Sequence, residues 1–251
     1  MFNNEIEFIS HKDYVDLKED QPIPIKLNIP EWYKNLKHGM ARGEKLTVKG
    51  CMPFLDTLTT GYLLKVSQDI HISHNVYNEE TKAQDSFYKV QDTFEQMFVA
   101  RGLNFHKNEA AIHPTFQAEG SPYVEKNKNL PFYKILNPWI IKTPPGYSCL
   151  FLPPLNNSDD RFSIMPGIVD TDTFTQEVNF PIVINGDKYD SIVTTIKKGT
   201  PCAQVIPFKR ESWKMKIVGK TSNEFNKKKL FYPFKLLHNY KERFWNKKSF
   251  K

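Results

Sequence analysis

The chain of 251 residues has room for one large domain or two small ones. Apolar residues make up 39% of it and aromatic residues 14%, enough to bury a core, which excludes global disorder. No apolar run approaches the roughly 18 residues that cross a bilayer, and the acidic N-terminal stretch does not have the pattern of a signal peptide. Three cysteines without C-x-x-C spacing (Cys51, Cys149 and Cys202) indicate neither a disulfide framework nor a structural metal site. We therefore expect a cytoplasmic protein with no membrane contact.

The charge is divided unevenly along the chain. Residues 209–251 hold 14 Lys/Arg against 3 Asp/Glu, a net charge of +11. Residues 1–208 hold 21 against 25, a net charge of −4, so the body does not have the basic surface expected of a nucleic-acid-binding domain.

The chain divides into three parts by composition. Residues 1–45 are a leader broken by Pro22, Pro24 and Pro30, which favours extended chain. Residues 30–36 fit a helical turn opened by proline at its first position. Residues 46–216 form the main domain. It opens with a stretch to Val76 that reads as strands, in which residues 69–74 alternate with period two. Residues 217–251 are a basic tail, in which apolar side chains at helical spacing predict an amphipathic helix.

An insertion at about 77–134 interrupts the main domain and is rich in Glu, Gln, Lys and Asn. Apolar residues within 86–100 recur at i, i+3 and i+4, which predicts one helix there. The remainder of the insertion is punctuated by proline and glycine and predicts irregular chain.

The stretch 137–216 reads as strands throughout. Turn signals recur every eight to twelve residues, a spacing typical of a β-sandwich or β-barrel rather than of β-α-β units. We expect strands at 139–142, 147–152, 162–165, 168–169, 178–184, 191–196 and 203–207.

Four motifs in residues 143–209 occur in the order found in the core of the dUTPase and dCTP deaminase superfamily, which this block resembles. They are Pro145-Gly146-Tyr147, the segment from Gly167 to Asp172, Asn185, and the turn from Gly199 to Gln204. The whole chain is also similar to a family of phage and bacterial proteins with no assigned activity. That second resemblance is carried by residues 53–56, 137–147 and 199–201.

The superfamily resemblance implies a mainly β fold, a dUTPase-like β-barrel of the jelly-roll type, assembled as a homo-oligomer, a trimer in that family. It implies a nucleotide ligand at subunit interfaces and magnesium as a cofactor if the protein hydrolyses nucleotides; no resident metal site is expected. In active members the residue matching Asp170 orients the attacking water, which makes Asp170 and Asp172 the candidate catalytic residues. Candidate ligand-binding residues are Phe174, Gln204 and His113.

Several family features are absent from the matching positions. The Arg-Ser phosphate motif would fall at residues 152–155, which read Leu-Pro-Pro-Leu, and Pro201-Cys202 replaces the Arg before Ala-Gln. The Gly-rich closing arm has no counterpart in the tail. Because a triphosphate needs cations and open amides, these departures favour a diverged site over an active dUTPase.

Each candidate residue also has a structural interpretation. Asp170 and Asp172 fit tight turns, because aspartate bonds its own backbone. His113 fits a cap on an irregular loop. His71 and His74 lie on a predicted strand at positions that point to opposite faces, so they do not form a metal pair. Cys149 and Cys202 fit small apolar core residues.

Three functions follow as alternatives. The first is a phage-type dUTPase-like protein that binds a ligand or partner without dUTPase chemistry. The second is an active nucleotide hydrolase or deaminase, so the sequence leaves open whether the protein is an enzyme. The third is a virion structural or assembly protein, located in the particle rather than in the host cytoplasm. The basic tail is interpreted as a solvated helix, a nucleic-acid or virion contact, or a subunit interface.

Overall fold

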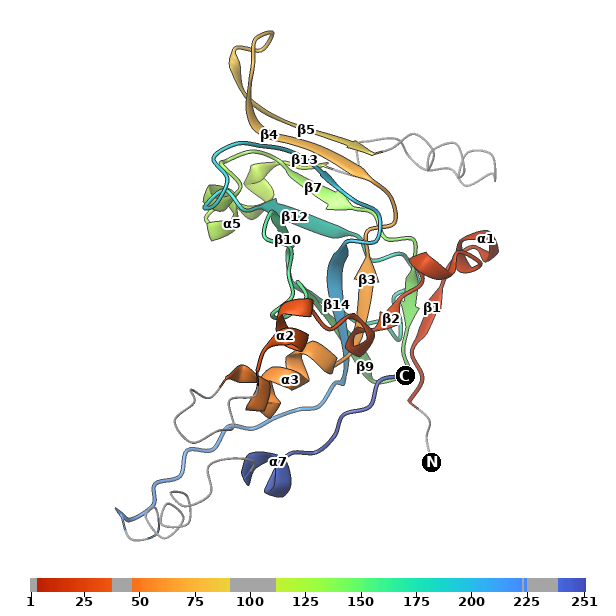
Figure 1. Ribbon diagram of the computed structural model, residues 1–251, viewed down its shortest axis with the longest axis vertical. Helices are drawn as coiled ribbons and strands as arrows, with labels where there is room; N and C mark the ends of the chain where they lie inside the picture. The colour runs from red at the N-terminus through yellow and green to blue at the C-terminus, as the bar shows by residue number, and fades with distance from the viewer. Residues whose placement is uncertain (1–3, 38–46, 91–111, 223, 225–238) are drawn as a thin grey trace.

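The computed structural model describes residues 4–37, 47–90, 112–222, 224 and 239–251. The chain is mainly β, as the sequence predicted, and its strands form four antiparallel sheets (Figure 1). Within the described residues these sheets do not close into a barrel.

The largest sheet has five strands in the order β11-β9-β14-β3-β2. It contains the strands predicted at 147–152, 168–169 and 203–207, which adjoin three of the four motifs. Its central strands β9 and β14 pair antiparallel, from Gln204 opposite Leu152 to Lys209 opposite Tyr147. The outer strands are too short to pair further, and Pro24 in β2 has no N–H to donate, which is why this sheet ends at both sides. The bounds are β2 (Ile23–Pro24), β3 (Tyr62–Lys65), β9 (Tyr147–Leu152), β11 (Gly167–Val169) and β14 (Pro201–Lys209).

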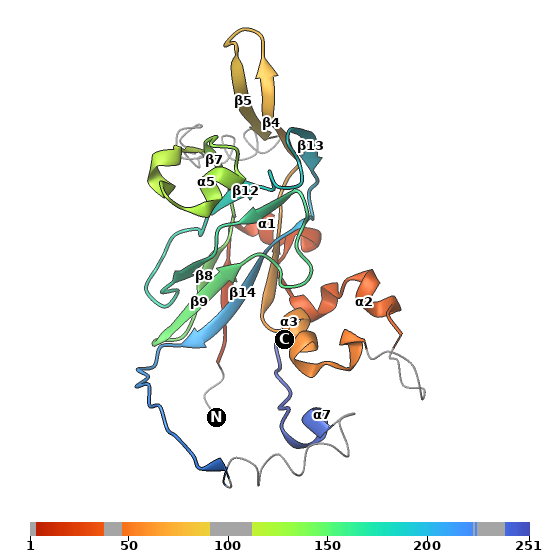
Figure 2. The same ribbon diagram turned by 90° about the vertical axis from the view of Figure 1, so that its left-hand side faces the viewer.

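Three smaller sheets complete the β structure. A four-stranded sheet has the order β10-β12-β7-β6, a three-stranded sheet has the order β13-β4-β5, and β1 pairs with β8. The β4–β5 hairpin projects from one end of the molecule in both views (Figures 1 and 2). The bounds are β1 (Glu7–Ile9), β4 (Ile70–Asn78), β5 (Ala83–Val90), β6 (Ile112–His113), β7 (Phe132–Ile135), β8 (Ile140–Lys142), β10 (Phe162–Ile164), β12 (Phe180–Ile184) and β13 (Ile192–Ile196).

The core lies between the sheets and takes alternate residues from their strands. Leu64 and Phe151 come from the five-stranded sheet, Ile72 from the three-stranded sheet, and Tyr133 and Phe180 from the four-stranded sheet. Burial along β4 alternates over Ile70, His71 and Ile72, which confirms the predicted period of two.

The helices are short. The α-helices are α1 (Lys12–Val15), α2 (Glu31–Asn35), α3 (Met52–Thr59), α5 (Pro122–Lys126) and α7 (Asn239–Arg243), and the 3-10 helices are η1 (Lys18–Asp20), η2 (Ile25–Asn28), η3 (Val48–Gly50) and η5 (Thr115–Ala118). Of the helices in the described ranges, none combines the length and hydropathy needed to cross a membrane.

Two predictions of secondary structure were wrong. The helix expected at 86–100 is instead strand β5 as far as Val90, because an eight-residue segment pairs with β4 across a long hairpin; residues 91–100 lie outside the described residues. The stretch from 46 to 59, expected as strand, contains α3, whose first turn carries Pro53, a residue that suits a helix start.

The leader and the tail also differ in part from the prediction. The leader is extended at β1 and β2, which pair with β8 and β3, and the helical turn predicted at 30–36 is confirmed as α2, whereas α1 was not predicted. The tail forms α7 within the predicted helical stretch, while residues 225–238 lie outside the described residues.

The two histidines of β4 occupy opposite faces, as predicted. His71 is exposed, and its Nδ1 lies 2.8 Å from Thr195 Oγ1. His74 is only 1% exposed, and its Nδ1 lies 2.7 Å from Ser86 Oγ. Cys149 and Cys202 are buried in the core, and burial raises the pKa of their thiols to about 11 and about 12.

His74 makes the stability of the fold depend on pH. Its side chain is buried, and this burial lowers its pKa from 6.5 to about 4. The unfolded chain takes up a proton below pH 6.5 and the folded chain only near pH 4, so stability is complete above pH 6.5 and falls between these values. Because of this residue, the free energy of unfolding of the parent, measured by urea denaturation, should be roughly 2 kcal/mol lower at pH 5 than at pH 7.5.

The substitution His74→Gln removes the titration and should reduce that difference, whereas His71→Gln, on the exposed face of the same strand, should leave it as in the parent. An equal loss at pH 5 in the parent and in His74→Gln would contradict the assignment.

Gly61 is required where the chain enters β3. Its φ is +84°, and a Cβ there would lie 2.1 Å from the main-chain oxygen of Val205 in β14. Gly120 has a φ of +77° with open space around it, so Gly120→Ala should lose only the roughly 1–2 kcal/mol of the left-handed conformation. Gly61→Ala should lose about 1–3 kcal/mol more through the steric clash, measured by urea denaturation. Equal losses would show that the backbone of β14 moves away freely.

Candidate functional site

Asp170 follows β11 and lies at the edge of the five-stranded sheet. Val169 pairs with Cys149, which brings Asp170 beside Ser148 of β9. The Ser148 hydroxyl donates to Asp170 Oδ1 at 2.7 Å, and the Asp170 side chain is 62% exposed. This carboxylate is therefore held on one side and open to solvent on the other.

A tight turn after Asp170 determines which side chains face the solvent. The main-chain N–H groups of Thr173 and Phe174 both donate to the Asp170 carbonyl, at 3.1 and 2.9 Å. Thr171 points inward, where its hydroxyl lies 2.7 Å from that of Thr143. The turn interpretation of the sequence thus holds for the main chain of Asp170, while its carboxylate bonds a neighbouring strand.

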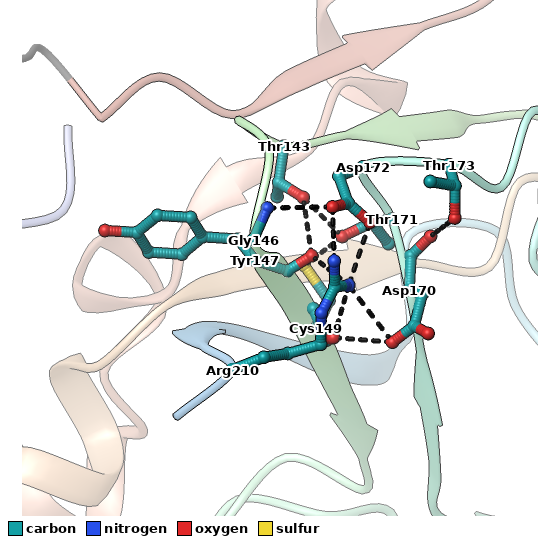
Figure 3. A network of polar contacts seen from close by, with 10 residues as sticks. Thr143, Gly146, Tyr147, Cys149, Asp170, Thr171, Asp172, Thr173 and Arg210 are labelled. Carbon is teal, nitrogen blue, oxygen red and sulfur yellow. Dashed lines mark hydrogen bonds and ion pairs between the residues drawn. The ribbon is translucent and has the colours of Figure 1, made fainter. Parts of the chain in front are cut away.

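Asp172 is bound on both carboxylate oxygens. Arg210 Nη1 donates to Oδ1 at 2.8 Å, Arg210 Nη2 donates to Oδ2, and the Gly146 N–H donates to Oδ2 at 2.8 Å (Figure 3). The Asp172 side chain is only 7% exposed. These three hydrogen bonds and the low exposure leave little of this carboxylate open to a ligand.

Arg210 is the centre of the cluster. It follows β14, and its own N–H donates to the Gly146 carbonyl at 2.8 Å, which continues the pairing of β14 beyond Tyr147. Its Nη1 also reaches the Tyr147 carbonyl at 3.0 Å and lies 3.3 Å from Asp170 Oδ1 (Figure 3). One guanidinium thus joins both aspartates to the start of β9.

The charges in the cluster explain its pKa values. Hydrogen bonds from Arg210, and then from Gly146, lower the pKa of Asp172 from 3.8 to about 2, and Asp172 in turn raises the pKa of Arg210. Two carboxylates and one guanidinium leave the cluster with a net charge of −1 at neutral pH.

These residues do not fit a magnesium–triphosphate group. Only Asp170 keeps carboxylate surface open, the cation that would meet phosphate is bonded to Asp172, and the net negative charge repels an anion. The described residues also contain no group of three or more His, Cys, Asp or Glu placed to hold a metal ion.

Of the other predicted ligand residues, Gln204 and His113 are not brought together with Asp170, whereas Phe174 lies in the same turn. Gln204 is 0% exposed, and its amide bonds three main-chain groups of α3 and the loop after β9, so it is a structural residue here and not open to a ligand. It lies four residues along β14 from Phe208, the partner of Ser148, about 13 Å away. Phe174 is 40% exposed in the turn after Asp172.

His113 also lies away from Asp170, because β6 belongs to the four-stranded sheet. Its Nδ1 is in hydrogen-bond contact with Gln117 Oε1 across the start of η5. His113 thus lies in a strand and its ring contacts a side chain, which differs from the predicted cap on an irregular loop.

Sequence reasoning missed Arg210 and Ser148, which the structure adds to the cluster. The sequence could have located Arg210 only through strand pairing. If the strand at 203–207 runs antiparallel to the strand at 147–152, its C-terminal end lies beside the Pro-Gly turn that precedes residue 147. Choosing that register required the partner strand to be known, because several strands of similar pattern compete for it.

A scan against protein-family models and a search of the curated proteins each found no match to the chain.

The pKa of Asp172 provides a direct test of the cluster. In Arg210→Met the carboxylate keeps only the Gly146 N–H, so its pKa should rise from about 2 toward 3.8. Carboxyl carbon NMR titration of the parent and the variant measures this shift. The neighbouring substitution Lys209→Met should leave the Asp172 titration unchanged. An unchanged pKa in Arg210→Met would assign the effect to Gly146 instead.

Proposed function

We propose that the protein is a partner-binding β protein related to the dUTPase superfamily, and that it does not carry out dUTPase chemistry. The observation that carries this proposal is the ion pair of Arg210 with Asp172, in which the cation of the cluster is bonded to a carboxylate of the same chain.

The relationship to the superfamily is supported by where the motif residues lie. Pro145-Gly146 forms the turn that leads into β9, Gly167 begins β11 just before Asp170, and the turn at Gly199 leads into β14. The resemblance implies the Pro-Gly turn into a strand, whereas residues 201–204 of its last motif lie in β14 and not in a turn. A phage origin, a cytoplasmic or virion location and a trimeric state rest on the resemblance and are part of the proposal.

The electrostatics favour a partner over a nucleotide. A phosphate group is recognised by free guanidinium, ammonium or amide N–H groups. Arg210 and the Gly146 N–H, the donors that approach Asp170 and Asp172, are already bonded to Asp172. Binding a triphosphate here would require breaking that ion pair. The net negative charge of the cluster would also repel the phosphate groups.

One observation favours the alternative of an active hydrolase. Asp170 is exposed, and Ser148 Oγ and Arg210 Nη1 lie 2.7 and 3.3 Å from its Oδ1. A carboxylate held in this way can orient a water molecule as a general base.

Nucleotide binding and turnover separate the two functions. The full chain is assayed by thermal shift against the deoxynucleoside triphosphates, with and without Mg²⁺, and for release of phosphate or pyrophosphate. Under the proposal no nucleotide raises the Tm and none is turned over. A nucleotide present at 100 times its Kd would raise it by about 5–10 °C, since it adds about 2.7 kcal/mol of stability.

The variant Asp170→Asn provides the control for the enzyme alternative. It should have the same Tm as the parent and equally little turnover. A selective rise in Tm with one nucleotide, or Mg²⁺-dependent turnover that is lost in Asp170→Asn, would overturn the proposal and establish the hydrolase.

A further inference from the structure

Residues 211–220, which we call the C-terminal arm, expose a run of large apolar side chains. Trp213, Met215 and Ile217 are 87%, 84% and 87% exposed, and Val218 is 61% exposed. The arm follows β14 but forms neither helix nor strand. The first three alternate with Lys214 and Lys216, so an extended arm presents an apolar side and a basic side.

The exposed area of the arm is large for a free surface. Fully exposed side chains of this size contribute on the order of 150–250 Å² each, so the arm exposes on the order of 500 Å² of apolar surface. Contiguous apolar patches of that size mark interaction sites. With an equal area on the surface that receives it, the contact reaches the roughly 1,000 Å² expected of a specific interface.

The end of the chain beyond the arm packs on the body, and the arm does not. Trp245 Nε1 donates to both oxygens of Asp56 in α3, at 3.0 and 3.1 Å, and the Phe250 ring packs edge-on against Tyr62 at 5.8 Å. The arm instead runs away from the sheets in both views (Figures 1 and 2). Residues 211–220 therefore differ from the end of the chain, which packs on the body through Trp245 and Phe250.

A second apolar surface, exposed among the described residues, lies on the three-stranded sheet. We call it the outer hollow, and its volume is about 510 Å³. Val193 of β13 pairs with Ser73 of β4, which pairs with Phe87 of β5, so Val193 and Phe87 flank Ser73 on one face. Val193 is 76% exposed and Phe87 is 60% exposed. The hollow is lined by His71, Ile72, Ser73, Phe87, Val193, Thr194 and Thr195.

The arm and the strands that line the outer hollow, β4, β5 and β13, lie at opposite ends of the molecule in both views (Figures 1 and 2). One chain therefore does not join its own two surfaces in this arrangement. Two copies placed head to tail do so, because each contact uses the arm of one copy and the hollow of the next.

We propose that the C-terminal arm of one copy docks its Trp213, Met215 and Ile217 side onto the outer hollow, around Val193 and Phe87, of a second copy. This head-to-tail contact closes into a ring or continues as a filament. The inference rests on the proposed function in one respect, since it names a second copy of this chain as the partner.

Light scattering coupled to gel filtration tests the contact on the full chain. The parent should elute with a mass above that of one chain. The arm variant, Trp213→Ser with Ile217→Ser, and the hollow variant, Val193→Lys with Phe87→Lys, should each elute as a monomer. Phe116→Ser, which removes a 70% exposed ring from η5, serves as the matched control and should keep the parent mass.

Mixing the two variants decides the geometry. The arm variant retains an intact hollow and the hollow variant retains an intact arm, so an equimolar mixture should form a dimer, joined by the one contact that remains. Circular dichroism confirms that each variant is folded; if the hollow variant is not, Val193→Lys alone takes its place, at a side chain already exposed to solvent.

A monomeric parent, variants that keep the parent mass, or a mixture that stays monomeric would each overturn this inference. A monomeric parent would also overturn the trimeric state that the resemblance implies, whereas the proposal that the protein lacks dUTPase chemistry fails instead on nucleotide binding or turnover.

Discussion

Strand β9 pairs with β11 on one side and with β14 on the other, and the arrangement of the candidate site depends on this double pairing. The first pairing brings Asp170 beside Ser148, and the second brings Arg210 to the turn at Gly146. Three segments far apart in the chain thus meet at one edge of the sheet. A shift of either strand by one residue would turn these side chains to the other face.

The same pairing ties the chemistry of the site to its structure. Arg210 gives Asp172 a bidentate partner in a place where only 7% of that side chain is exposed, so the carboxylate has a low pKa and a structural role. What remains open to solvent is one carboxylate, that of Asp170. Because Arg210 and Asp172 pair with each other, this cluster is suited to stabilising a turn. Binding of a partner is then expected at other, exposed surfaces of the protein.

The sequence predicted much of the fold where strands alternate clearly, and failed where local pattern and tertiary pairing disagree. The strands from Tyr147 onward and the opposite faces of His71 and His74 follow from period two. Residues 86–90 carry apolar spacing that also suits a helix, but pairing with β4 made them strand. The sequence predicted Asp170 and Asp172 together as candidate residues. It also predicted that Gln204 binds a ligand, but the Gln204 side chain bonds main-chain groups inside the protein.

By itself the sequence determined the β class of the fold, the turns at its glycines and prolines, the acidic body and the basic C-terminal region, because these depend on local composition and periodicity. Only the tertiary structure decided that the sheets stay open, that Arg210 neutralises Asp172, and that the C-terminal arm and the outer hollow lie apart at opposite ends. Those features depend on the register between distant strands, and register is selected by the packing of the whole core rather than by any one segment.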